Sequence, residues 1–169
     1  MHRLVPAALA AACLFPSSAL AWVSGTGGQN LGRIVAARAA ATTFAVPLRG
    51  PLESPFGYRW GRLHAGQDIG VRGTDRVHAA LAGRVVSVGY QPYYEGYGNI
   101  VLLRHGRGLA TLYAHLASYR VAPGDRLERG ELLGRAGCTG SCTGQHLHFE
   151  VRVHGKPVDP KRFLPHTLR

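Results

Sequence analysis

The stretch from Gln145 to Val151 concentrates ionisable side chains at the spacing of a β-strand. Residues two apart on a strand point to the same side, so His146, His148 and Glu150 share one face. The opposite face is apolar, as expected for a strand packed on a core, and consists of Leu147, Phe149 and Val151. Two imidazoles side by side on a rigid element suit a metal site. The pattern is weak by itself, because nine histidines in 169 residues produce a His-x-His about half the time by chance.

Two other stretches supply ligands of the same kind. His64 and Asp68 stand four residues apart, and His115 ends a run in which Thr111 and Tyr113 are expected on the same strand face. Together the chain offers four histidines and one aspartate, more than a catalytic zinc site needs. Such a site uses three protein ligands and leaves the fourth position to water. A surplus histidine is then free to act on that water or on the developing oxyanion.

The remaining ionisable residues fit supporting or structural roles. Glu150 shares the histidine face, and we expect it to support a ligand rather than to bind metal or act as a base. His105 falls in a predicted turn and is interpreted as structural. No partner pattern surrounds three further histidines, for which we expect packing or solvated roles: His78, His154 and His166.

From residue 44 onwards, short β-type runs alternate with Gly, Pro and Asp turn signals. No convincing long amphipathic helix interrupts them, which indicates an all-β domain. Strands are expected over residues 84–88, 99–104, 109–116, 131–135 and 146–153. The turn sequence His105-Gly106-Arg107-Gly108 predicts a hairpin between two of them. The domain that positions the ionisable residues is thus predicted to be a single compact antiparallel β-sandwich or partly open barrel.

Several ordered motifs share their residue types with one known family. Between Phe44 and Leu164 the chain resembles the lysostaphin-type (LytM-domain) zinc metallopeptidases, which are peptidoglycan endopeptidases. The motifs that carry the resemblance are Ser54-Pro55-Phe56-Gly57-Tyr58-Arg59, His64-Ala65-Gly66-Gln67-Asp68-Ile69, Gly96-Tyr97-Gly98-Asn99, Thr111-Leu112-Tyr113-Ala114-His115-Leu116, Gly137-Cys138-Thr139-Gly140, His146-Leu147-His148-Phe149-Glu150-Val151 and Val158-Asp159-Pro160.

The resemblance implies a role for each of five residues. His64, Asp68 and His148 match the family's ligands for one zinc ion, while His115 and His146 match its non-ligand catalytic histidines. All five are present, so nothing marks the chain as a degenerate member of that family. Two departures are small and remove no ligand: Gln67 replaces the usual aliphatic residue and Gln145 a common Pro.

Three further residues are candidates for orienting a metal ligand or the substrate. Arg59, Asn99 and Tyr113 lie within the matching motifs and carry polar groups able to hold a neighbouring side chain.

The N-terminus predicts export. Arg3, an apolar run ending at Phe15, and Ala19-Leu20-Ala21 are typical of a secretory signal peptide over residues 1–21. Lipoprotein processing at Cys13 is the less favoured alternative, since Ala10 stands where such sites usually carry Leu. Residues 22–43 are expected to form a linker or N-terminal arm before a zinc metallopeptidase domain over residues 44–166. The expected location is the periplasm, or the extracellular space and cell wall.

The charge balance predicts attraction to polyanions. The formal net charge is +11, carried by 18 Arg and two Lys scattered along the chain. Such a surface suits anionic wall polymers, although general solubility explains it equally well. Export argues against nucleic acid as a partner, and the absence of a second hydrophobic segment argues against stable membrane insertion.

Two cysteines follow the predicted cleavage site. Cys138 and Cys142 flank a short flexible turn, and export favours a disulfide between them. Half of a zinc site is the rival interpretation, which lacks a second cysteine pair.

Three functions remain open from the sequence. The leading one is an exported zinc endopeptidase that cleaves peptide cross-links or stem peptides of peptidoglycan, acting as a monomer. The alternative is a non-catalytic module of the same fold that binds peptidoglycan or activates another hydrolase. A secreted endopeptidase acting on proteins is the third.

Overall fold

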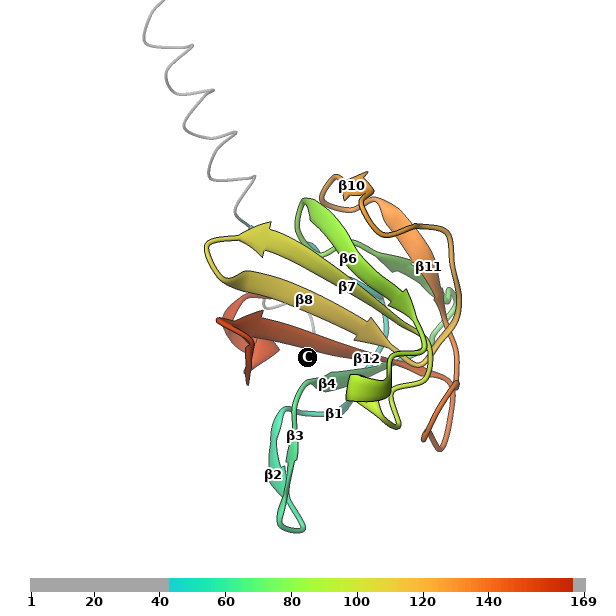
Figure 1. Ribbon diagram of the computed structural model, residues 1–169. Coiled ribbons are helices and arrows are strands. Elements are labelled where there is room, and N and C mark those ends of the chain that lie inside the picture. The colour runs from blue at the N-terminus through green and yellow to red at the C-terminus, as the bar shows by residue number, and fades with distance from the viewer. Residues whose placement is uncertain (1–42, 166–169) are drawn as a thin grey trace, which may run out of the picture.

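The computed structural model describes residues 43–165 and is built almost entirely from short strands (Figure 1). The elements in chain order are β1 (Leu52–Ser54), β2 (Gly57–Arg59), β3 (Arg62–His64), β4 (Gln67–Gly70), β5 (Arg76–His78), β6 (Gly83–Gly89), η1 (Pro92–Tyr94), β7 (Ile100–Gly106), β8 (Leu109–Ala114), β9 (Leu116–Tyr119), β10 (Arg126–Leu127), β11 (Leu132–Ala136), β12 (His146–Val153), β13 (Lys156–Val158) and η2 (Pro160–Arg162). The prediction of an all-β domain is confirmed.

The strands form antiparallel sheets that do not close into a barrel. The main sheet has eight strands in the order β1-β4-β12-β8-β7-β6-β10, with β13 pairing to β12. A second sheet has the order β5-β11-β9, and β2 pairs only with β3 in a hairpin that projects from the body (Figure 1). These sheets agree with the predicted antiparallel β-sandwich or partly open barrel.

Strand β12 lies in the middle of the main sheet, between β4 and β8. Its inner side chains Leu147, Phe149 and Val151 are fully buried in a core shared with Val77 of β5 and Leu133 of β11. This alternation is the expected one, and it leaves His146, His148 and Glu150 on the outer face of the sheet.

The predicted strand over residues 109–116 is wrong in one respect. It breaks at His115, whose φ of 58° is rare for a residue with a Cβ atom, and β9 starts at the next residue. The break redirects the His115 side chain. Thr111 and Tyr113 remain on the inner face, fully buried, and the expectation that all three share a face fails.

Several predictions concern parts of the chain outside the described residues. These are the signal peptide over residues 1–21, the alternative processing at Cys13, nearly all of the arm over residues 22–43, and His166. Within residues 43–165, no helix has the length and apolar character needed to cross a membrane.

Candidate active site

Neighbouring strands bring the three predicted metal ligands together. Asp68 on β4 is the direct cross-strand partner of His148 on β12, so their side chains lie adjacent. His148 Nδ1 lies 2.8 Å from Asp68 Oδ1. His64, the last residue of β3, places its Nε2 3.1 Å from each of these two atoms. The three donor atoms form one compact cluster.

A tight turn returns the chain from His64 to Asp68. At Gly66 the backbone passes so close to β12 that a Cβ atom would lie 2.4 Å from the carbonyl oxygen of Phe149 and 2.9 Å from His148 Nε2. Only glycine permits this approach. Gly66 therefore determines the geometry of the cluster as much as the ligands do.

Hydrogen bonds on the far side of each ring determine which nitrogen faces the cluster. His64 Nδ1 lies 2.7 Å from the Pro55 carbonyl oxygen, which can only accept, so Nδ1 carries the proton. His148 turns the other way and places Nε2 3.2 Å from the Glu150 carboxylate, so Nε2 is its donor. Both rings therefore direct a lone pair at Asp68 Oδ1.

Three acceptors at such short range repel one another unless a cation lies among them. A tetrahedral zinc ion with bonds of roughly 2.0–2.1 Å separates its ligand atoms by about 3.3 Å. The observed separations are 2.8 to 3.1 Å. Imidazole nitrogen and carboxylate oxygen are also the donors of catalytic zinc sites. The donor set therefore fits a zinc ion.

The electrostatics of the cluster agree with that fit. Burial alone would raise the pKa of Asp68, but hydrogen bonds to His148 and His64 outweigh it and hold the pKa well below its usual range. Burial lowers the pKa of His148, yet its hydrogen bonds to Asp68 and Glu150 more than offset this and raise it. The pocket thus favours a positive charge between these groups, whether a proton or a metal ion supplies it.

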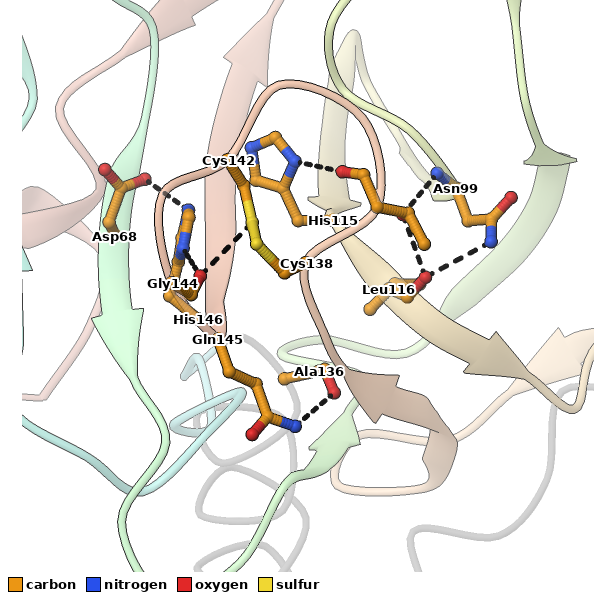
Figure 2. The surroundings of a disulfide bond; sticks show 11 residues. Asp68, Asn99, His115, Leu116, Ala136, Cys138, Cys142, Gly144, Gln145 and His146 are labelled. Carbon is orange, nitrogen blue, oxygen red and sulfur yellow. Dashed lines mark hydrogen bonds and ion pairs between the residues drawn. A yellow bond between two sulfur atoms is a disulfide. The ribbon is translucent and has the colours of Figure 1, made fainter.

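The two other predicted histidines lie beside the cluster. The ring centroids of His115 and His146 are 4.8 Å apart, and His146 Nε2 lies 3.8 Å from Asp68 Oδ1. Nδ1 of His115 donates to the Thr139 carbonyl oxygen at 2.8 Å. Nδ1 of His146 donates to the Gly144 carbonyl oxygen at the same distance (Figure 2). Each ring therefore keeps the lone pair of its Nε2 available, and both line the same groove as the metal-binding candidates.

Comparison with known families decides the classification. Residues 62–160, more than half of the chain, match the model of peptidase family M23. The chain belongs to peptidase family M23. The resemblance to lysostaphin-type peptidases is thereby confirmed, and members of this family are zinc-dependent metallopeptidases.

Individual M23 relatives cover the same domain. The DD-carboxypeptidase/endopeptidase Mpg of Neisseria meningitidis is 42% identical over 116 residues, which are 64% of this chain and 26% of that protein. The peptidoglycan DD-endopeptidase ShyA of Vibrio cholerae is 38% identical over 96 residues, 57% of this chain and 22% of that protein. The chain thus spans about a quarter of the length of these curated relatives.

A solved M23-like structure supports the architecture. The zinc-containing peptidase from Vibrio cholerae superimposes with a TM-score of 0.65 at 32% identity, covering 73% of this chain and 41% of that one.

The M23 domain holds His115 in its unusual backbone conformation by several hydrogen bonds. Its N–H donates to the Tyr97 carbonyl oxygen at 2.9 Å, and the next N–H, of Leu116, donates to the Asn99 carbonyl oxygen at 3.1 Å. The side-chain Nδ2 of Asn99 donates to the Leu116 carbonyl oxygen at 3.2 Å. Asn99 therefore supports the bend that aims His115 at the groove, and its predicted role in orienting a metal ligand or the substrate stays a prediction.

The other two predicted supporting residues have different outcomes. Arg59 lies 3.7 Å from Asp68 Oδ2, the oxygen that faces away from the cluster, and its guanidinium also donates to Ser54 Oγ. The prediction that Tyr113 orients a metal ligand or the substrate is wrong. Tyr113 is fully buried on the inner face, its ring centroid lies 5.3 Å from that of Phe149, and its hydroxyl accepts the Ala80 N–H at 2.8 Å. It therefore takes no part in the groove.

The most important residue that the sequence did not single out is Tyr97. Its hydroxyl donates to Glu150 Oε1 at 2.5 Å, and the same oxygen faces His148 Nε2. Its ring lies edge-on to His148, with centroids 5.1 Å apart. Burial, together with Glu150, raises the pKa of Tyr97, so the hydroxyl stays protonated as a donor. The Gly-Tyr-Gly-Asn motif was the available signal, although a motif alone does not show where its tyrosine points.

Glu150 takes the supporting place expected for it. The carboxylate is fully buried, contacts His148 and Tyr97 through Oε1, and lies 3.5 Å from Arg152 Nε through Oε2. It holds the far side of a ligand ring and does not reach the cluster itself. Carboxylates in this place fix the tautomer of a metal-bound imidazole.

The predicted disulfide is present in the loop before β12. Cys138 and Cys142 are joined, with Cα atoms 5.5 Å apart, and Cys142 Sγ contacts the Gly144 carbonyl oxygen, which accepts from His146 (Figure 2). The rival interpretation of the pair as half of a zinc site is therefore wrong.

Proposed function

We propose that the chain is an exported zinc-dependent endopeptidase that hydrolyses cross-link or stem peptides of bacterial peptidoglycan. One observation carries the proposal: two ring nitrogens and one carboxylate oxygen converge within 2.8 to 3.1 Å of one another, beside two histidines whose Nδ1 atoms are held by carbonyl oxygens. Membership of family M23 and the peptidoglycan DD-endopeptidase among its relatives support the substrate class. The signal-peptide pattern supports export, and the net charge of +11 favours approach to anionic wall polymers.

His64, Asp68 and His148 are assigned to the metal. Zinc held there supplies Lewis-acid chemistry, which makes water a nucleophile near neutral pH and polarises the scissile carbonyl. Glu150 and the Pro55 carbonyl oxygen keep the two ligand rings in the required tautomers. Arg59 holds the outer oxygen of Asp68, so that Oδ1 remains directed at the cluster.

His146 and His115 are assigned to proton transfer and positioning. His146 Nε2 lies 3.8 Å from Asp68 Oδ1, at the edge of the cluster, and it accepts the proton of the attacking water. The resulting imidazolium donates that proton to the amine nitrogen that leaves when the C–N bond breaks. Burial lowers the pKa of His115, so its ring is neutral at pH 7 and its Nε2 orients the same water.

The proposal is tested with the purified chain on isolated sacculi. Chelation should stop clearance, and added zinc should restore it. Mass analysis of the fragments should show new peptide ends and identify the bond. Stoichiometric zinc without new ends would instead identify a binding or activating module. Faster cleavage of ordinary polypeptides than of muropeptides would identify an endopeptidase that acts on proteins.

A further inference from the structure

The loop that leads into β12 carries both the disulfide and the carbonyl groups that hold the non-ligand histidines. Thr139 lies directly after Cys138, and Gly144 lies two residues after Cys142. The Thr139 carbonyl oxygen accepts from His115, and the Gly144 carbonyl oxygen accepts from His146 (Figure 2). Neither contact belongs to the metal cluster, so the loop acts on the histidines assigned to chemistry.

The disulfide touches the group that holds His146. Cys142 Sγ lies 3.2 Å from the Gly144 carbonyl oxygen, and because a disulfide sulfur carries no proton this is a packing contact. At Gly144 itself, an added Cβ would meet no described atom within 4 Å, so nothing else packs on that side of the residue. Backbone and side-chain hydrogen bonds anchor the segment on either side of residues 142–144. Before them, the Ser141 N–H donates to the Gly96 carbonyl oxygen at 2.7 Å, and after them Gln145 Nε2 donates to the Ala136 carbonyl oxygen and the His146 N–H to that of Gly137.

The group that holds His115 is anchored without the disulfide. The Thr139 hydroxyl donates to the Leu116 carbonyl oxygen at 3.0 Å and accepts the Asn99 N–H at 2.9 Å. The Thr139 backbone also packs against Gly98, where a Cβ would lie 2.4 Å from it. Thr139 is therefore fixed to the 96–99 segment in its own right.

We propose that the Cys138–Cys142 disulfide positions His146 for proton transfer, by fixing the Gly144 carbonyl oxygen that holds the ring in its Nδ1–H form. The inference rests on the function proposed above. It implies that the proposed activity depends on an oxidising compartment, in which the disulfide persists. Reduction frees Gly144, so His146 rotates or changes tautomer. His115 and the metal ligands keep their partners, because none of those partners depends on the bridge.

The first measurement compares the oxidised zinc-loaded chain with the chain treated with a water-soluble trialkylphosphine. The phosphorus is oxidised to the phosphine oxide by taking an oxygen atom from water. The S–S bond breaks and each sulfur receives one of the two protons of that water. Reduction should lower kcat by roughly 10- to 100-fold, the loss expected for a misplaced reacting group, with KM and bound zinc unchanged. Reoxidation should restore kcat.

The second measurement follows the ring nitrogens of the histidines by NMR at pH 8, which needs no turnover. Reduction should replace the single Nδ1–H form of His146 by a mixture and leave His115 unchanged. The variant Cys138→Ala/Cys142→Ala should behave like the reduced chain and ignore the phosphine. It also excludes an effect of free thiols on the zinc.

Two results would overturn the inference. One is an unchanged His146 ring with unchanged kcat after reduction. The other is a joint loss of zinc and of both histidine signals, which would mean that the bridge merely stabilises the loop. An oxidised chain that cleaves no sacculi contradicts the proposed function alone, and the NMR comparison still decides the role of the disulfide.

Discussion

The two faces of the main sheet each carry a group of polar side chains, and the groups are satisfied in opposite ways. On the inner side, His105 Nδ1 donates to the Ala82 carbonyl oxygen and its Nε2 pairs with Thr111 Oγ1, both at 2.8 Å. Thr111 in turn pairs with the Tyr113 hydroxyl, which accepts the Ala80 N–H. Every polar side-chain atom in this chain of contacts has a protein partner.

On the outer side, three polar atoms meet at one point. Nε2 of His64, Oδ1 of Asp68 and Nδ1 of His148 face one another at 2.8 to 3.1 Å, an arrangement that needs a positive charge among them. The comparison teaches that a histidine's neighbours, rather than its burial, distinguish a structural ring from one that is free for metal or proton transfer. The following experiments test that distinction.

The largest effect is expected for His148→Ala. It removes one of the three converging acceptors, so the chain should lose its zinc and more than about 10³-fold in activity. Zinc content by elemental analysis and clearance of sacculi measure both. His105→Ala is the matched control from the inner group and should bind zinc normally. A variant of His148 that retains zinc and activity would remove the distinction between the faces.

His146→Ala should separate catalysis from metal binding. The ring lies beside the cluster but supplies none of the converging atoms, so zinc should remain while kcat falls by roughly 10²- to 10⁴-fold. His115→Ala should behave in the same way. Loss of zinc in either variant would show that the ring is a metal ligand and not a proton-transfer group.

Glu150→Gln tests whether the buried carboxylate behind His148 tunes the cluster. The amide keeps the shape but weakens the acceptor that fixes His148 Nε2, so zinc affinity should fall by about 10- to 100-fold. Competition with a chromogenic chelator gives the affinity. Tyr97→Phe removes the other hydrogen bond to the same carboxylate oxygen and should shift the affinity in the same direction by less. Unchanged affinity in both variants would confine the metal site to its three ligands.

The sequence predicted the strands and the candidate site residues better than it predicted the directions in which side chains point. The alternation in β12 separated its two faces correctly, because a strand with one buried face has a fixed period. The all-β class and the disulfide were predicted for equally local reasons. The metal and catalytic roles came from the family resemblance, and they remain predictions.

The predicted side-chain directions are wrong where the backbone departs from a regular strand. A positive φ at His115 has no glycine to signal it, so Tyr113 and His115 were placed on one face although they point to opposite sides of the sheet. Tyr97 reaches Glu150 across 53 positions of sequence, a contact that only the folded sheet creates. Such contacts depend on how segments meet, and local patterns do not encode them.

The smallest expected effect is the acid sensitivity that the inner group gives to the fold. Burial lowers the pKa of His105 below its usual 6.5, only partly opposed by the hydrogen bond to Ala82. Because the folded pKa lies below the unfolded one, His105 contributes its full stability above about pH 6.5 and loses it as the pH falls.

His105→Gln keeps a donor and an acceptor but does not titrate. The urea midpoint of the wild type should therefore fall more than that of the variant between pH 7.5 and 5.5. Comparing the two chains cancels the groups they share, including the zinc ligands. Equal shifts of the urea midpoint in both chains would mean that protonation of His105 does not destabilise the fold. The protein partners of His105 would then not be what distinguishes it from the histidines of the groove.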